Sequence, residues 1–244
     1  MLGTVWYAIR SACGLVLIVL YTLVIATYLI ILTHINDRSR QITPLMRSWG
    51  RLFLFVAGVK METEGAERLD PNGSYVVVSN HLSNLDAPLH IATMPVSVRF
   101  LAKKELFKIP IFGSAMRSIG IVETDRMAGP TAHRAINRQV ARVVDLQRSL
   151  VIYPEGTRSK DGELHAFKKG AFRIAVDNEM PVVPVTISGT QLVWPPGHNI
   201  VRPGTVKMVI HAPIPTAGLQ ARDIDALRDR VHETVTRTWE RIRP

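Results

Sequence analysis

The chain has 244 residues, enough to bury one good-sized hydrophobic core without calling for a second. Its formal net charge of +10 favours anionic partners such as membrane headgroups and phosphorylated lipids. Nucleic acid is not an expected partner, because the sequence has no zinc-ligand spacing, aromatic-rich RNA-binding motif or solid basic tract. The single cysteine, Cys13, excludes an internal disulfide framework and leaves the rest of the chain without a cysteine nucleophile.

A long uncharged stretch lies near the start of the chain. Residues 11–36 contain no Lys, Arg, Asp or Glu, and residues 15–32 are almost wholly aliphatic. A helix needs about 20 apolar residues to cross a bilayer core. A cleaved signal peptide has a shorter apolar region, roughly 7–15 residues, and a small-x-small cleavage site that is missing here. We therefore expect a membrane helix rather than a signal peptide or a buried core helix.

Arginines are more frequent after this stretch than before it. Arg10 precedes it, and four arginines follow it at positions 38, 40, 47 and 51. If the helix spans the membrane, this asymmetry places the following domain on the cytoplasmic side. Residues 45–56 are apolar with a tryptophan and two arginines, which is typical of an interfacial helix, although packing against a core explains them equally well. The predicted organisation is a membrane-binding helical unit, spanning or re-entrant, in residues 1–58 and a globular domain in residues 59–244.

Short runs rich in β-branched residues recur through the second part of the chain. They lie at residues 60–63, 75–79, 98–101, 120–123, 150–153, 182–188 and 206–211. Apolar residues at helical spacing mark two longer segments, residues 131–148 and 224–239. Strands that alternate with helices predict an α/β fold with a central mixed or parallel sheet flanked by helices. Ligands bind such sheets beyond the carboxyl ends of the strands.

A histidine and an aspartate follow the second of these predicted strands. His81 comes directly after it, and Asp86 lies five positions later, a spacing that does not suit one face of a helix. A turn between them would bring the carboxylate back to the imidazole, giving a general base and the group that orients it. An N-cap is the structural alternative for Asp86, since a proline follows it in a predicted first turn. Asn80 and Ser83 are interpreted as local turn formers that hold the histidine.

Four segments carry a family resemblance. NHLSNLD at residues 80–86 and YPEGTRS at residues 153–159 are similar to motifs I and III of the glycerolipid acyltransferases, in particular the 1-acyl-sn-glycerol-3-phosphate acyltransferases. Residues 120–126 resemble motif II and residues 183–185 resemble motif IV, in the order of that family. The resemblance implies transfer of a fatty acyl group from acyl-CoA or acyl carrier protein to the sn-2 hydroxyl of lysophosphatidic acid. Phosphatidic acid is then the product.

The resemblance also implies roles for individual side chains. His81 becomes the general base and Asp86 the group that steadies its ring, with no metal and no dissociable cofactor required. A phosphate site is expected to include Glu155, Gly156, Thr157, Arg158, Arg126, Lys103 and Lys104. Glycine lets the backbone approach a ligand, threonine offers a hydroxyl, and arginine binds phosphate with two hydrogen bonds. The structural alternatives are a surface turn with an exposed ion pair and, for the lysines, a solvated face.

Other functions are weighed against this one. A lipid hydrolase would use Ser83 or Ser79 as its nucleophile with His81 as base, although the G-x-S-x-G elbow is absent. A non-catalytic membrane adaptor that retains the fold is a third hypothesis, and other lyso-lipids are alternative acceptors within the family. The remaining histidines, among them His90 and His165, are interpreted as ordinary surface or packing residues.

Overall fold

A seven-stranded sheet forms the centre of the computed structural model, which describes residues 2–124 and 130–244. The strand order is β1-β7-β6-β2-β5-β3-β4, and every neighbouring pair is parallel except β6 and β7. The bounds are β1 (Val59–Glu64), β2 (Val76–Ser79), β3 (Val98–Lys103), β4 (Val122–Thr124), β5 (Ser149–Ile152), β6 (Val182–Ser188) and β7 (Gly204–Ile210). The predicted mixed sheet is confirmed.

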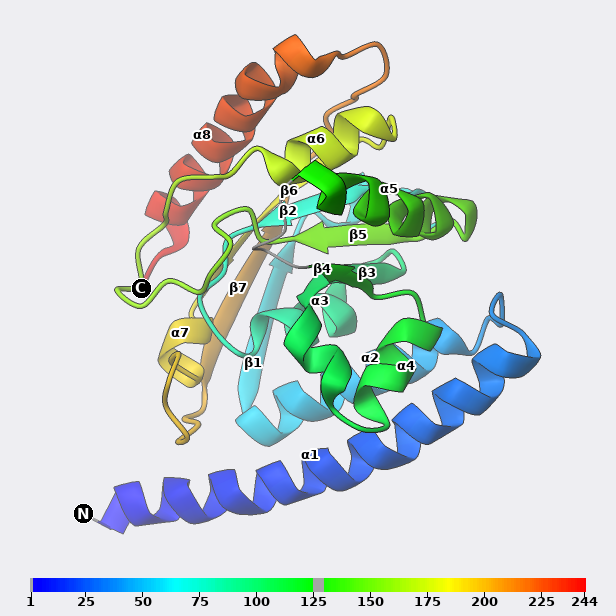
Figure 1. Ribbon diagram of the computed structural model, residues 1–244. Coiled ribbons are helices and arrows are strands. Elements are labelled where there is room, and N and C mark those ends of the chain that lie inside the picture. Colours follow the sequence, from blue (N-terminus) through cyan, green and yellow to red (C-terminus); the bar gives the residue numbers. More distant parts are fainter. Residues whose placement is uncertain (1, 125–129) are drawn as a thin grey trace.

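Two layers of helices cover the two faces of the sheet (Figure 1). On one side lie α1 (Leu2–Ile35), α2 (Ile42–Ala57), α3 (Asp86–Thr93) and α4 (Phe112–Ser118). On the other side lie α5 (Pro130–Asp145), α6 (Gly170–Asp177) and α8 (Ile224–Ile242). The short helix α7 (Thr190–Val193) follows β6, and 3-10 turns occupy Ala66–Arg68, Lys104–Lys108 and Ala221–Asp223.

The central strands are buried on both faces, which explains their continuous apolar runs. Val76, Val77 and Val78 of β2 have no exposed surface. Val77 packs toward α1–α4, whereas its two neighbours pack toward α5, α6 and α8, as strand alternation requires. Near-continuous valine sequences are what a parallel sheet between two helical layers selects.

One strand is offset from its predicted position. The sequence run suggested residues 120–123, but β4 begins at Val122. Gly120 has a φ of 88°, and the amide of Ile121 still donates to the carbonyl of Met116 at 2.9 Å. These two residues therefore close the turn after α4 instead of joining the ladder, because their backbone groups are already committed there.

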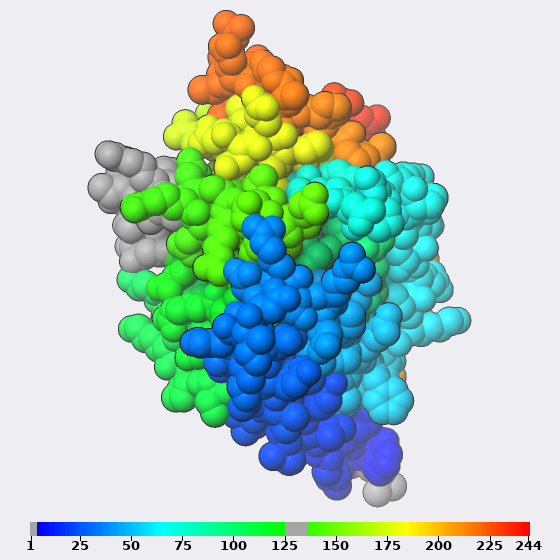
Figure 2. Space-filling view, turned by 90° about the vertical axis from the view of Figure 1, so that its right-hand side faces the viewer, coloured from blue at the N-terminus to red at the C-terminus, as the bar shows by residue number. Residues whose placement is uncertain are grey.

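The two N-terminal helices form an antiparallel pair (Figure 1) and lie at the surface of the domain (Figure 2). Residues Thr4–Ile35 of α1 are long and apolar enough to cross a membrane. Near the start of α1, Arg10 Nη2 donates to the carbonyl of Val56 at 2.7 Å. Near its middle, Thr22 Oγ1 accepts from Trp49 Nε1 at 2.9 Å. The pair is thus joined along much of its length.

Helix α2 also packs closely against α3, the helix that carries Asp86. Ile42 and Met46 of α2 are buried, and a Cβ on Gly50 would lie only 2.6 Å from the carbonyl oxygen of Pro88. Glycine therefore permits the close approach of these two helices. Of the two interpretations of residues 45–56, packing against the core is present on this face, while Phe55 on another face stays exposed.

Candidate active site

The loop after β2 is attached to the sheet by Asn80. Its side-chain Nδ2 donates to the carbonyl of Ile187 at 2.9 Å, and its Oδ1 accepts from the amide of the same residue at 2.8 Å. The side chain is fully buried. Asn80 was expected to be a local turn former, and this expectation is wrong. It bonds across to β6 and fixes the point where the chain leaves β2, because a buried amide side chain needs both partners.

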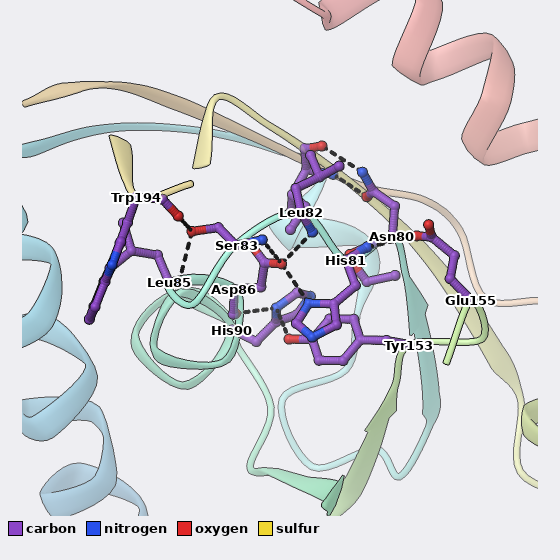
Figure 3. A network of polar contacts seen from close by, with 12 residues as sticks. Asn80, His81, Leu82, Ser83, Leu85, Asp86, His90, Tyr153, Glu155 and Trp194 are labelled. Atoms are coloured by element: carbon purple, nitrogen blue, oxygen red, sulfur yellow. Dashed lines mark hydrogen bonds and ion pairs between the residues drawn. The ribbon is translucent and has the colours of Figure 1, made fainter. Parts of the chain in front are cut away.

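His81 and Asp86 meet at hydrogen-bonding distance, as the predicted turn requires. His81 Nδ1 lies 2.7 Å from Asp86 Oδ2, and the carboxylate is fully buried. The same oxygen accepts from the amides of Leu82 at 2.6 Å and Ser83 at 2.8 Å (Figure 3). An oxygen that accepts from two amides is acting as an acceptor, so we assign the hydrogen between the pair to Nδ1. The Nε2 lone pair of His81 is then available as a base.

The N-cap role considered for Asp86 is not the one it plays. An N-cap side chain accepts from amides in the first turn of its own helix. Asp86 is itself the first residue of α3, and its carboxylate accepts from Leu82 and Ser83, which precede the helix. The carboxylate therefore closes the 81–86 loop on itself and orients the imidazole at the same time.

The hydroxyls of the two serines considered as nucleophiles already donate hydrogen bonds to backbone carbonyls. Ser83 is fully buried, and its Oγ donates to the carbonyl of Trp194 at 2.6 Å while accepting from the amide of Leu85 at 3.1 Å. Ser79 is also buried, and its Oγ donates to the carbonyl of Asn80 at 3.2 Å. A hydroxyl whose hydrogen is already donated to a carbonyl is not activated by His81. This geometry disfavours the serine hydrolase hypothesis.

The 153–159 segment holds the main chain of His81 from both sides. Glu155 Oε1 accepts from the His81 amide at 2.8 Å, and the Ser159 amide donates to the His81 carbonyl at 2.8 Å. Glu155 Oε2 accepts from the amide of His165 at 3.3 Å. Burial raises the pKa of the Glu155 carboxyl to about 7, and these amide hydrogen bonds act in the opposite direction.

The assignment of Glu155 to the phosphate site is therefore a correction. Its carboxylate is buried and both of its oxygens accept backbone hydrogen bonds. Glu155 braces the loop that presents His81. The sequence alone shows that the glutamate lies close to a threonine and an arginine that can bind an anion. It does not show that the glutamate side chain turns inward.

The exposed half of the segment faces an open cavity of about 560 Å³. Thr157, Arg158 and Lys103 line this cavity together with His81, so the structure brings these four predicted residues together. Gly156 has a φ of 79°, a conformation in which glycine is favoured, and a Cβ there would lie 2.7 Å from Lys168 Nζ. Among the described residues, Lys104 is not part of the cavity lining. Arg126 lies outside the described residues.

The rest of the cavity is mainly apolar and extends away from His81 between the helices. Its walls come from α1, α2, α3, α4 and β3. The apolar residues that line it include Ile25, Leu29, Met46, Ile91, Phe100, Leu101, Phe112, Met116, Ile119 and Ile121. Such a cavity next to a general base accommodates a hydrocarbon chain attached to the reacting group.

Two aromatic residues near His81 were not recognised from the sequence. Tyr153 stacks on the His81 ring, with ring centroids 4.0 Å apart and planes at 10°. His90, interpreted as an ordinary packing residue, is fully buried and contacts both Asp86 and Tyr153. The only sequence signal was the aromatic position directly before the Pro-Glu-Gly run. No group of three or more His, Cys, Asp or Glu side chains within the described residues is placed to hold a metal, and the requirement for no cofactor stays a prediction.

Comparison with known proteins identifies the family. The acyltransferase family model matches residues 60–188, more than half of the chain. A chloroplastic 1-acyl-sn-glycerol-3-phosphate acyltransferase of Brassica napus is 35% identical over 82% of this chain, which spans 58% of that relative. The human 1-acyl-sn-glycerol-3-phosphate acyltransferase beta is 32% identical over 89% of this chain and 78% of its own length.

A solved structure gives the same result in three dimensions. The 1-acyl-sn-glycerophosphate acyltransferase PlsC from Thermotoga maritima superimposes with a TM-score of 0.74 at 29% sequence identity. The match covers 96% of this chain and 97% of the other. The resemblance in the four sequence segments is thereby confirmed, and the fold that holds His81 and Asp86 is that of its relatives. This chain belongs to the acyltransferase family.

Proposed function

We propose that the protein transfers a fatty acyl group from a thioester to the sn-2 hydroxyl of 1-acyl-glycerol-3-phosphate, giving phosphatidic acid in phospholipid biosynthesis. The observation that carries the proposal is the position of the His81–Asp86 pair. It lies in an apolar cavity that also contains Lys103 and Arg158. The cavity thus combines a general base, space for an acyl chain and cations for a phosphate. The relatives that match the chain are named for this reaction.

The proton transfer follows from the geometry of the pair. His81 Nε2 accepts the proton of the acceptor hydroxyl while Nδ1–H donates to Asp86, whose negative charge stabilises the imidazolium. The resulting alkoxide attacks the thioester carbonyl and forms a tetrahedral intermediate. The C–S bond then breaks, the ester remains, and the imidazolium returns its proton to the leaving thiolate. No acyl-enzyme forms, which agrees with the committed hydroxyls of Ser83 and Ser79.

The acceptor phosphate binds at the cationic side of the cavity. Arg158 and Lys103 are exposed and line the cavity with His81. Arginine binds phosphate with two hydrogen bonds and lysine adds a point charge. Arg126 and Lys104 are the further cations proposed for this site from the sequence. Holding the phosphate positions the sn-2 hydroxyl at His81, and such orientation supplies several kcal/mol of a reaction barrier.

The acyl chain of the donor occupies the apolar part of the cavity. Each methylene that leaves water for an apolar environment gains about 0.8 kcal/mol. The thioester carbonyl is then held near His81 while the carrier stays outside. Both candidate carriers, coenzyme A and acyl carrier protein, are anionic and suit a chain with a net charge of +10. The proposed chemistry needs no metal or dissociable cofactor.

The N-terminal helices attach the protein to the bilayer that contains its lipid substrate and product. Helix α1 exposes a row of large apolar side chains, among them Val16, Leu20 and Val24. If α1 spans the bilayer, the arginines that follow it support a cytoplasmic position for the catalytic domain. A lyso-lipid then reaches the cavity without leaving the membrane surface.

The test is an acyl-transfer assay on purified protein in detergent. The protein is incubated with labelled acyl-CoA or acyl-ACP and a panel of lyso-lipids that differ in headgroup. We expect labelled phosphatidic acid from 1-acyl-glycerol-3-phosphate, at a higher kcat/KM than from any other acceptor. Preference for a lyso-lipid without a terminal phosphate would contradict the proposed acceptor. Release of free fatty acid without an acceptor would contradict transfer.

A further inference from the structure

Tyr153 and His90 have no part in the proton transfer, yet both belong to the contacts around His81 (Figure 3). The ring of Tyr153 lies parallel to the His81 ring, with centroids 4.0 Å apart and an interplanar angle of 10°. The two rings are also held by different elements, since Tyr153 directly follows β5 and His81 lies in the loop after β2. The stack therefore depends on the sheet and not on local sequence.

On its far edge, Tyr153 contacts a second imidazole. The Tyr153 hydroxyl lies 3.3 Å from His90 Nδ1, and the two rings meet edge to face at 78°. His90 Nδ1 lies 2.7 Å from the backbone carbonyl oxygen of Asp86. A carbonyl only accepts, so Nδ1 carries a hydrogen. Burial lowers the pKa of His90 to about 4, and the ring is neutral at physiological pH.

These contacts close a circuit that begins and ends at His81. The Asp86 carboxylate bonds to His81, the Asp86 carbonyl to His90, His90 contacts Tyr153, and Tyr153 stacks on His81. The hydrogen bond at Nδ1 fixes one atom of the catalytic ring but permits rocking about the line from Nδ1 to Asp86. A parallel aromatic ring against one face opposes that rocking. The two contacts together define where Nε2 points.

We propose that Tyr153 is a positioning residue that sets the plane of the His81 imidazole. His90, which contacts both the Asp86 carbonyl and the Tyr153 hydroxyl, holds Tyr153 in a fixed position relative to Asp86. The kinetic part of this inference rests on the acyl-transfer function proposed above. The purpose of the circuit is to keep the Nε2 lone pair aimed at the acceptor hydroxyl. Proton transfer to a misaligned base is slow, and a displacement of about 1 Å lowers rates by roughly 10²-fold.

Simple packing does not account for His90. Its Nε2 is buried and has no hydrogen-bond partner among the described residues. A bare buried nitrogen is unfavourable, and an apolar side chain of similar size would fill the same space without that cost. The imidazole is thus present despite this cost, and the shorter of its two hydrogen-bonding contacts is to the residue that orients His81. A role in fixing the circuit explains this choice.

Kinetics of the full-length protein test the circuit. We expect Tyr153→Leu to lower kcat by about 10²-fold with little change in either KM, because the stack is lost. Tyr153→Phe keeps the stack and loses only the contact with His90, so its kcat falls roughly 2–10-fold. His90→Leu removes the same contact from the other side and is expected to match it. The Tyr153→Phe, His90→Leu double variant then loses no more than either single variant.

Two matched variants control for loss of a buried ring elsewhere. Tyr75 is buried directly before β2, and its hydroxyl accepts from the amide of Asp70. His232 packs edge to face on Phe167 outside the site. We expect Tyr75→Leu and His232→Leu to keep the wild-type kcat per folded molecule, even where they lower the melting temperature. A loss of kcat in these controls equal to that in Tyr153→Leu would overturn a specific role for Tyr153.

A spectroscopic readout separates the circuit from the proposed reaction. In protein labelled with ¹³C-histidine, the ring protons of His81 lie over the face of Tyr153 and resonate upfield, and His81→Gln identifies them. Tyr153→Leu is expected to move these resonances downfield, whereas Tyr153→Phe leaves them shielded. Unchanged resonances in Tyr153→Leu, or shifted resonances with a wild-type kcat, would each overturn the inference. If the wild-type protein transferred no acyl group, the proposed function would fail while the stack remained measurable.

Discussion

The two halves of one short segment behave differently. Tyr153 and Glu155 turn into the protein, where one stacks on the His81 ring and the other accepts a hydrogen bond from the His81 amide. Thr157 and Arg158, only a few positions later, are exposed and line the cavity. Gly156 separates them in a left-handed conformation. The inward half acts on the base, with Tyr153 also lining the cavity beside His81, and the outward half presents exposed polar groups to the substrate.

This contrast shows why neighbours in a motif need not share a role. Changing the inward half disturbs His81 whichever acceptor is present. Changing the outward half matters only for acceptors that carry a phosphate. The two kinds of change are therefore separated by comparing a phosphorylated acceptor with an uncharged one such as a monoacylglycerol. His81 is the centre that both halves serve.

The largest effect is expected at that centre. His81→Ala removes the general base and is expected to lower kcat by at least the 10²–10⁴-fold that is typical of such catalysis, about equally for both acceptors. Asp86→Asn is expected to be severe as well, because an amide cannot stabilise the imidazolium by charge and favours the wrong tautomer. The measurement is acyl transfer at matched concentrations of folded protein, checked by melting curves.

Ser83→Ala is the matched control for this loop. It leaves the carbonyl of Trp194 and the amide of Leu85 without their partner, so we expect a loss of about 1–3 kcal/mol in stability. Activity per folded molecule should stay near the wild-type level. An inactive Ser83→Ala protein with a normal melting curve, or an acyl-serine trapped by rapid quench, would contradict direct transfer.

The next largest effect is expected in the outward half. Arg158→Ala removes a charge-assisted contact worth about 1.5–3 kcal/mol, or roughly 10–150-fold in kcat/KM for the phosphorylated acceptor. The KM for the acyl donor should change little. Arg158→Lys keeps the charge but loses the paired geometry, so an intermediate loss is expected. Lys160→Ala removes an exposed charge two positions away and is the matched control. Equal loss toward the uncharged acceptor would place Arg158 with the inward half.

A smaller effect, with a distinctive pH dependence, is expected in the inward half. Burial raises the pKa of Glu155 from 4.5 to about 7, so the folded protein keeps a proton that the unfolded chain loses. The stability contributed by protonated Glu155 is fully present below pH 4.5 and is lost as pH rises through 7. Relative to Glu155→Gln, the wild-type protein should thus lose about 1–3 kcal/mol between pH 5 and pH 8.

Melting temperatures of the two proteins across this range provide the measurement. A constant difference between them would show that Glu155 is ionised throughout. Activity supplies the second part of the comparison, because glutamine offers one acceptor oxygen to two amides. We expect a roughly 2–10-fold lower kcat with both acceptors. A loss confined to the phosphorylated acceptor would return Glu155 to the phosphate site.

The contrast between the two halves also shows which features of the fold and the site can be predicted from the sequence. The sheet follows from short runs of β-branched residues, and α5 and α8 follow from apolar residues at helical spacing. The turn from His81 to Asp86 follows from the spacing of these two residues. The directions of Glu155 and Asn80 do not follow, because each bonds to backbone far away in the sequence. The contact between Tyr153 and His90 cannot be predicted for the same reason, because it depends on how β5 and α3 are placed in the fold.

Helix α1 repeats the contrast between two faces, and there the expected effect on catalysis is smallest. Leu29 is buried against the domain, whereas Leu20 and Val24 are exposed. If the exposed face enters the bilayer, each lysine placed there costs up to about 2.5–3.5 kcal/mol of insertion. A Leu20→Lys, Val24→Lys variant should therefore leave membranes in a carbonate wash while keeping its melting temperature and its kcat in detergent. Leu29→Ala should do the reverse, losing about 2–5 kcal/mol of stability but staying attached. Release of the wild-type protein by high salt alone would instead assign membrane binding to its basic surface.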